Sequence, residues 1–151
     1  MKDIKRIIKD IIREELMVET FDIKSTTELS KLYSEPPQNF SDMLVRKWKY
    51  KEFDMLFTIQ IISKNEINVD YYCMINGIAD PNVDLGNNAW GYNLAIVFGI
   101  LKDELDKHKY EKITFEAITY RPTLYKYYID KYFPEYKLKK VGQNKYAMIL
   151  K

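Results

Sequence analysis

Apolar and polar residues alternate along two neighbouring stretches in the middle of the chain, residues 53–61 and 67–75. A two-residue period places every apolar side chain on one face of an extended strand. A short polar segment, residues 63–66, separates the two stretches, and this arrangement predicts an antiparallel hairpin with one buried face. The preceding stretch, residues 43–50, is ambiguous but compatible with a further strand whose buried face carries Trp48.

The hydrophobic period changes several times in the last third of the chain. Residues 80–88 are rich in Asn and Asp and predict an irregular loop. A helical repeat then covers residues 91–107, and alternation returns at residues 113–118. A second helix is expected from Pro122, because proline suits a first helical turn, where its missing N–H has no partner to lose. The closing stretch predicts a hairpin with strands at residues 136–141 and 145–150.

The N-terminal 17 residues predict an amphipathic helix, which we separate from a single domain at residues 18–151. Lysines and an arginine occupy the positions outside its apolar stripe. A first strand is expected at about residues 18–24, and a capping box that starts at Ser25 then opens a short helix ending at Tyr33. The fold class is therefore mixed α+β. The stripe of the N-terminal helix consists of Ile4, Ile7, Ile8, Ile11 and Ile12.

Composition narrows the function classes. A chain of 151 residues fits one domain, and a net charge of +2 with interspersed lysines and acids gives no nucleic-acid signature. The single Cys73 cannot form an intrachain disulfide, and with one histidine, His108, no metal site is indicated. No apolar run reaches the length of a membrane span, so a cytoplasmic location is expected.

The last third resembles the C-terminal half of the GCN5-related N-acetyltransferase (GNAT) superfamily, and small tailed-phage proteins of that fold in particular. The likeness covers the second half of the chain in detail and the first half only by element order. It implies a central twisted mixed sheet flanked by helices, to which the N-terminal helix is an addition. The residues that carry the resemblance are Ile113, Phe115, Ala117, Arg121, Leu124 and Tyr125.

The resemblance also implies acetyl-CoA as cofactor, with its pyrophosphate on backbone N–H groups where a loop leads into the long helix. Tyr125 matches the family's general acid, which protonates the departing thiolate. For the general base, Asp80, Asp84 and Glu116 are the candidates by position. The cofactor-binding candidates are Asn88, Gly91, Tyr92 and Asn93, of which only Gly91 matches the family's loop signature.

Two functions stay open at this point. The first is an acyl-CoA-dependent N-acetyltransferase that acts on an unknown amine. The second is a catalytically inactive GNAT-fold scaffold, a phage structural or assembly protein in the host cytoplasm or the virion. Its N-terminal helix would dock on a second copy or another protein through Ile4, Ile7, Ile8 and Ile11. Each site residue also has a plain structural interpretation: Gly91 starts a helix, Tyr125 packs among other tyrosines, and Cys73 is a small buried side chain.

Overall fold

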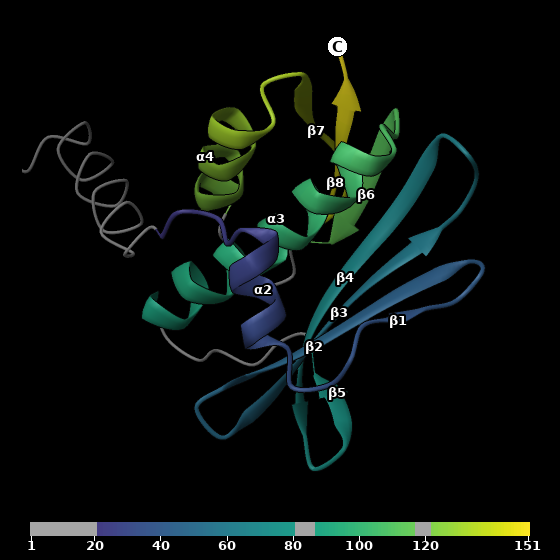
Figure 1. The fold of residues 1–151 in the computed structure, drawn as a ribbon. Coiled ribbons are helices and arrows are strands. Elements are labelled where there is room, and N and C mark those ends of the chain that lie inside the picture. The colour runs from purple at the N-terminus through teal and green to yellow at the C-terminus, as the bar shows by residue number, and fades with distance from the viewer. Residues whose placement is uncertain (1–20, 81–86, 117–121) are drawn as a thin grey trace, which may run out of the picture.

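The computed structural model describes residues 21–80, 87–116 and 122–151, and these form a mixed α+β fold, as expected (Figure 1). The N-terminal helix expected at residues 1–17 lies outside the described residues. The helices are α2 (Thr26–Leu32), α3 (Asn87–Lys107) and α4 (Pro122–Tyr132). The strands are β1 (Gln38–Asn39), β2 (Met43–Tyr50), β3 (Phe53–Ile61), β4 (Glu66–Ile75), β5 (Ile78–Asp80), β6 (Lys112–Glu116), β7 (Tyr136–Gly142) and β8 (Lys145–Leu150).

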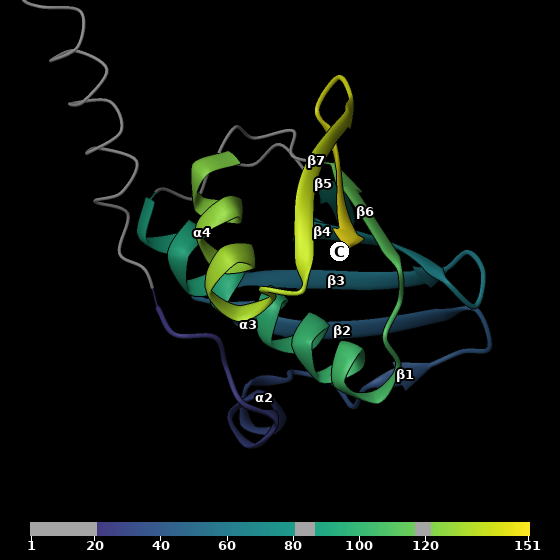
Figure 2. The same ribbon diagram turned by 90° about the horizontal axis from the view of Figure 1, so that it is seen from above.

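The strands form one sheet in the order β1-β2-β3-β4-β6-β8-β7, with β5 paired to β4 outside this path. Among these pairs only β4 and β6 run parallel, and α3 forms the crossover between them. These two strands are therefore parallel neighbours joined by a helical crossover. Figure 2 shows that β6, β8 and β7 cross the direction of β2 and β3, so the sheet is strongly twisted.

The two faces of the sheet differ in character. The apolar positions of β3 and β4 face α3 and α4, and Phe57, Ile59 and Ile67 are at most 1% exposed there. Most side chains on the opposite face are half-buried or exposed, and within the described residues that face is mainly polar. We term it the polar face and define it by Asn68, Asp70 and Tyr72 of β4 together with Thr114 and Glu116 of β6.

The first strand, expected at residues 18–24, is wrong for its described part, because residues 21–25 form no strand. The N–H of Lys24 donates instead to the carbonyl of Ala95 in α3, at 3.1 Å. Phe21 exchanges hydrogen bonds with the hydroxyl of Tyr128 in α4. The segment therefore crosses the helices, and Gly99 permits this, because a Cβ there would lie 2.5 Å from the Lys24 carbonyl oxygen.

The connection between β4 and α3 also differs from the expectation. Part of it forms β5, and α3 begins at Asn87, four residues before the expected start at Gly91. Buried Ala89, 2% exposed, anchors this extra turn in the core. The other elements agree with the sequence: Ser25 and Glu28 form the capping box of α2, β2 buries Trp48, and β7 and β8 form the terminal hairpin.

Candidate functional site

The parallel pair of strands separates within the sheet. The described pairing of β4 with β6 runs from Glu66↔Lys112 to Val69↔Phe115, and Glu116, one residue later, is the last residue of β6 that the structure describes. Strand β4 continues to Ile75, where its last three residues pair with β5 instead. We term the point after Val69 and Phe115 the strand divergence. Because side chains alternate along a strand, the residues on either side of this point face opposite sides of the sheet.

Tyr125 lies at the strand divergence on the helix-covered face. The centroid of its ring lies 5.4 Å from that of Phe115 and 6.2 Å from that of Phe98, and the residue is 9% exposed. Tyr71, two residues beyond Val69 on the same face, is close enough for the Tyr125 phenol to contribute, after burial, to its raised pKa. Burial likewise raises the pKa of Tyr125. The Tyr125 hydroxyl is therefore protonated at neutral pH, as a proton donor must be.

Asp70 and Glu116 lie at the strand divergence on the polar face, each directly after the last residue of its strand in the β4–β6 pairing. The Asn68 amide donates to the Asp70 carboxylate at 3.1 Å, and Thr114 donates to the Asn68 carbonyl at 2.8 Å. Burial, followed by the nearby charge of Glu116, raises the pKa of Asp70. Hydrogen bonds from Tyr72 and Asn68 and the charge of Lys145 oppose this rise without cancelling it.

A groove with a cavity volume of about 670 Å³ runs over this part of the polar face. We term it the polar groove. Its charged side chains include Asp70, Glu116 and Lys145, and also Glu66 and Lys112, whose charged groups lie 4.0 Å apart. The sequence interpretation named Glu116 but missed Asp70. The signal was present, since Asp70 occupies a polar position in the alternation of β4, but its closeness to Glu116 depends on the strand register.

The four cofactor-binding candidates do not form one site. Asn88 lies in the first turn of α3, where backbone N–H groups lack partners inside the helix. Gly91 lies a full turn inside the helix, so its N–H belongs to the regular ladder, and its carbonyl accepts a hydrogen bond from Tyr128 at 3.3 Å. The expectation that Gly91 opens the helix is therefore wrong, and its contact with a phosphate stays a prediction.

Tyr92 and Asn93 serve packing instead of a surface site. Asn93 is fully buried, accepts from the Trp48 indole N–H at 2.8 Å and donates to the Ala89 carbonyl at 2.9 Å. The ring of Tyr92 packs edge-on against Phe21, with centroids 6.0 Å apart, and also contacts Tyr50. Since both side chains are committed to the core and its rim, their expected contacts with a cofactor do not fit this structure.

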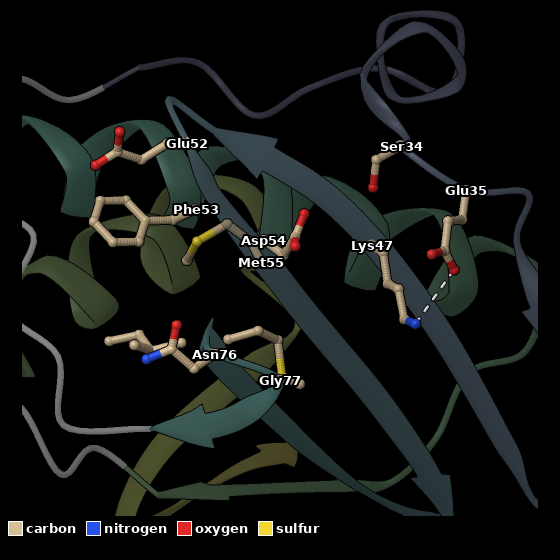
Figure 3. A pocket seen from close by; sticks show the side chains of 11 residues that line it. Ser34, Glu35, Lys47, Glu52, Phe53, Asp54, Met55, Asn76 and Gly77 are labelled. Atoms are coloured by element: carbon tan, nitrogen blue, oxygen red, sulfur yellow. Dashed lines mark ion pairs between the residues drawn. The ribbon is translucent and has the colours of Figure 1, made fainter.

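A second hollow of about 430 Å³ lies between the β2–β3 turn and the β4–β5 turn (Figure 3). Figure 3 shows Lys47 reaching toward Glu35, and their charged groups are 3.2 Å apart. Asp54, which also lines the hollow, has Lys49 at 3.8 Å. Both lysines thus neutralise a neighbouring acid, and this hollow offers less for acid–base chemistry than the polar groove.

Cys73 and His108 occupy structural positions. Cys73 is 5% exposed, and burial raises the pKa of its thiol, which disfavours the nucleophilic thiolate. His108 follows α3, and its Nε2 lies 2.8 Å from the carbonyl oxygen of Lys64. Asp80 ends β5, and Asp84 lies outside the described residues.

In the part of the chain that the structure describes, no helix is both long and apolar enough to cross a bilayer.

No protein-family model matches this chain, and comparisons with curated proteins and with solved structures find no match either. The strand divergence has a proton donor, Tyr125, on one face and a carboxylate, Asp70, on the other. It is therefore the best candidate for acid–base chemistry among the described residues.

Proposed function

We propose that the chain is a GNAT-like N-acetyltransferase that transfers an acetyl group from acetyl-CoA to an amine. The observation that carries the proposal is the strand divergence between β4 and β6, with the protonated phenol of Tyr125 over it. An extended, amide-containing arm would lie between the separated parallel strands. Tyr125 is also the residue that the resemblance assigns as general acid, and its packing against Phe115 supports that assignment.

The first turn of α3 supports binding of the phosphates. The helix starts at Asn87, and its first backbone N–H groups point out of the helix end together with the positive end of the helix dipole. Of the four candidates named from the sequence, Asn88 alone stands in this turn. The backbone of residues 87–89 thus takes the place that the resemblance gives to Gly91.

Acetyl-CoA supplies an activated acyl thioester when bound. Tyr125 gives its phenolic proton to the departing sulfur as the C–S bond breaks and the C–N bond forms. The surroundings of Tyr125 favour this role in two ways. Phe98 and Phe115 hold the ring in place, and they exclude water from it.

Ligand-induced stabilisation tests the proposal. A ligand at a hundred times its Kd stabilises the folded state by about 2.7 kcal/mol, so acetyl-CoA should raise the melting temperature of the full chain. Sodium sulfate at the same concentration is the control for unspecific anion binding and should have a much smaller effect. If millimolar acetyl-CoA leaves the melting temperature unchanged, the proposal is contradicted.

A catalytically inactive scaffold is the second candidate. It is favoured by the packing roles of Tyr92 and Asn93, which leave the family's loop signature largely unmet. In that case the chain would act as a phage structural or assembly protein, in the host cytoplasm or the virion, and dock through the isoleucine stripe of residues 1–17. Absence of any acetyl-CoA effect, together with loss of self-association on deletion of the stripe, would support this candidate.

A further inference from the structure

We infer that the polar groove is the acceptor site, where Asp70 holds the ammonium group of a primary amine and takes one of its protons. This inference rests on the proposed acetyltransferase function and extends it to the second substrate. It assigns roles to Asp70 and Glu116, whose approach depends on how β4 and β6 pair.

The geometry places the two reacting sides opposite each other. Asp70 and Glu116 follow Val69 and Phe115 directly, so they reach the strand divergence from the polar face. Tyr125 packs on Phe115 and reaches the same point from the helix-covered face. An acyl group held between the separated strands would have a proton donor on one side and a base on the other. An amine can approach it only from the side that is open, and that side is the polar groove.

The charges around Asp70 favour a cationic ligand. On β4, Asp70 accepts hydrogen bonds from the neutral side chains of Asn68 and Tyr72. The negative charge of Glu116 on β6 and the positive charge of Lys145 on β8 both act on its carboxylate. Further along the groove, Glu66 and Lys112 balance each other, and the lining residues from β3 are the uncharged Gln60 and the adjacent Ile62. Lys145 is thus left to balance both Asp70 and Glu116, and the pKa of Asp70 is raised despite it. An ammonium group would supply the missing positive charge.

The proton balance gives Asp70 its role. A primary amine has a pKa of about 10 and arrives as an ammonium ion, which has no lone pair to react. Breaking one N–H bond passes a proton to the Asp70 carboxylate and leaves the pair on nitrogen. That pair forms the C–N bond as the C–S bond breaks. Asp70 releases its proton to water through the groove, and the second proton that nitrogen loses replaces the one that Tyr125 gives to sulfur.

The hydrogen bonds around Asp70 support a positioning function for its neighbours. Thr114 holds Asn68, and Asn68 holds one oxygen of Asp70, so the carboxylate is fixed across the two strands. A base fixed in this way loses little freedom when the amine binds. Asn68 and Thr114 are therefore the residues whose NMR signals should report an amine beside Asp70.

The test measures amine binding without acetyl-CoA. Propylamine is titrated into the full chain at neutral pH, with propanol as the uncharged control and a capped Ala-Lys-Ala peptide to ask whether a protein-bound lysine also fits. Propylamine should shift the amide signals of Asn68 and Thr114, and propanol should not. The Asp70→Asn variant should bind propylamine at least tenfold more weakly. Asp54→Asn is the matched control, because it also removes one carboxylate but lies in the second hollow beside Lys49, outside the polar groove, and it should bind as the native chain does.

Turnover gives the second measurement. With acetyl-CoA present, Asp70→Asn should lower kcat at least a hundredfold, since a general base contributes about 10²–10⁴-fold. The variant should also lack the fall in rate at acid pH that protonation of the Asp70 carboxylate causes in the native chain. Equal propylamine binding in Asp70→Asn and the native chain, or shifts that map outside the groove, would overturn the acceptor site even if acetyl-CoA binds. Failure of acetyl-CoA to bind would overturn the proposed function and, with it, the proton transfer.

Discussion

The indole N–H of Trp48 donates a hydrogen bond of 2.8 Å to the side-chain carbonyl of Asn93, and both residues are fully buried. The bond joins β2 to α3 through the core. The amide nitrogen of Asn93 donates one turn back to the Ala89 carbonyl, so Asn93 is satisfied on both sides. A buried polar group without a partner costs free energy, so each of the two side chains satisfies the hydrogen-bonding group of the other and offsets the cost of burying it.

Asn93→Leu should lower the free energy of unfolding by about 1–3 kcal/mol, because it leaves the Trp48 N–H buried without an acceptor. Trp48→Phe removes the donor and should be combined with Asn93→Leu in a double-mutant cycle. Chemical denaturation should then give a coupling energy of about 0.5–3 kcal/mol between the two positions. Additive effects would show that the hydrogen bond contributes little.

The elements with a sustained hydrophobic period were predictable from sequence. Strands β3 and β4, helix α4 and the terminal hairpin lie where the pattern places them, since burial of one face enforces the period. The same pattern failed at residues 21–24. Phe21 and Ile23 alternate as in a strand, but the backbone partners of this segment lie in α3 and α4, far along the chain. No local pattern contains that information.

The site was less predictable than the fold, for the same reason. Asn93 reads as a surface residue near a helix start, yet its partner Trp48 lies 45 residues earlier. Asp70 can be assigned to the polar face from alternation alone. Its nearness to Glu116 follows only from the pairing of Val69 with Phe115, which no single stretch of sequence encodes. Tyr125 was found because it belongs to a motif, and whether it acts as a general acid stays a prediction.

Gly99→Ala should destabilise the protein by about 1–3 kcal/mol, as overpacking commonly does. An added Cβ would lie 2.5 Å from the Lys24 carbonyl oxygen and 3.1 Å from its nitrogen, and these are backbone atoms that cannot swing away. The sign is diagnostic, because Gly to Ala inside a helix otherwise stabilises by about 1 kcal/mol. Gly142→Ala is the control, with its closest contact at 3.4 Å. Thermal melts that show Gly99→Ala to be neutral or stabilising would contradict the close crossing.

Tyr125→Phe should lower kcat by about 10²-fold or more while acetyl-CoA still raises the melting temperature, because only the proton donor is removed. Tyr127→Phe is the matched control. It lies in the same helix, but its hydroxyl accepts a hydrogen bond from Lys131 at the surface, 3.2 Å away. Unchanged turnover in Tyr125→Phe would mean that the ring serves packing alone, and the general-acid role should then be dropped.

Asp70→Asn should stabilise the protein more at neutral pH than at acid pH. The folded-state pKa of Asp70 is raised, so between its ordinary value and the raised one the folded state binds more protons than the unfolded chain. Stability therefore falls as pH rises through that window, and the variant escapes this loss. Glu116 is the neighbouring acid that adds to the rise, and Lys145 opposes it. Melting temperatures of the variant and the native chain from pH 3 to 7 measure the difference, and a gap that shrinks with rising pH would contradict the assignment.

Deletion of residues 1–16 should leave a folded domain that has lost self-association or assembly. Phe21, the first described residue, is kept in the shortened chain. Its N–H donates to the Tyr128 hydroxyl at 3.2 Å, and its carbonyl accepts from that hydroxyl at 2.9 Å. Burying each isoleucine of the removed stripe is worth about 1.5–3 kcal/mol, and so short a helix is marginal alone, so the stripe needs a surface to dock on. Light scattering after size-exclusion chromatography measures the mass of both forms, and a full-length Ile4→Glu/Ile11→Glu variant separates the stripe from mere length. If the truncated chain unfolds or becomes insoluble as a monomer, the surface that binds the stripe belongs to this domain, and no partner is required.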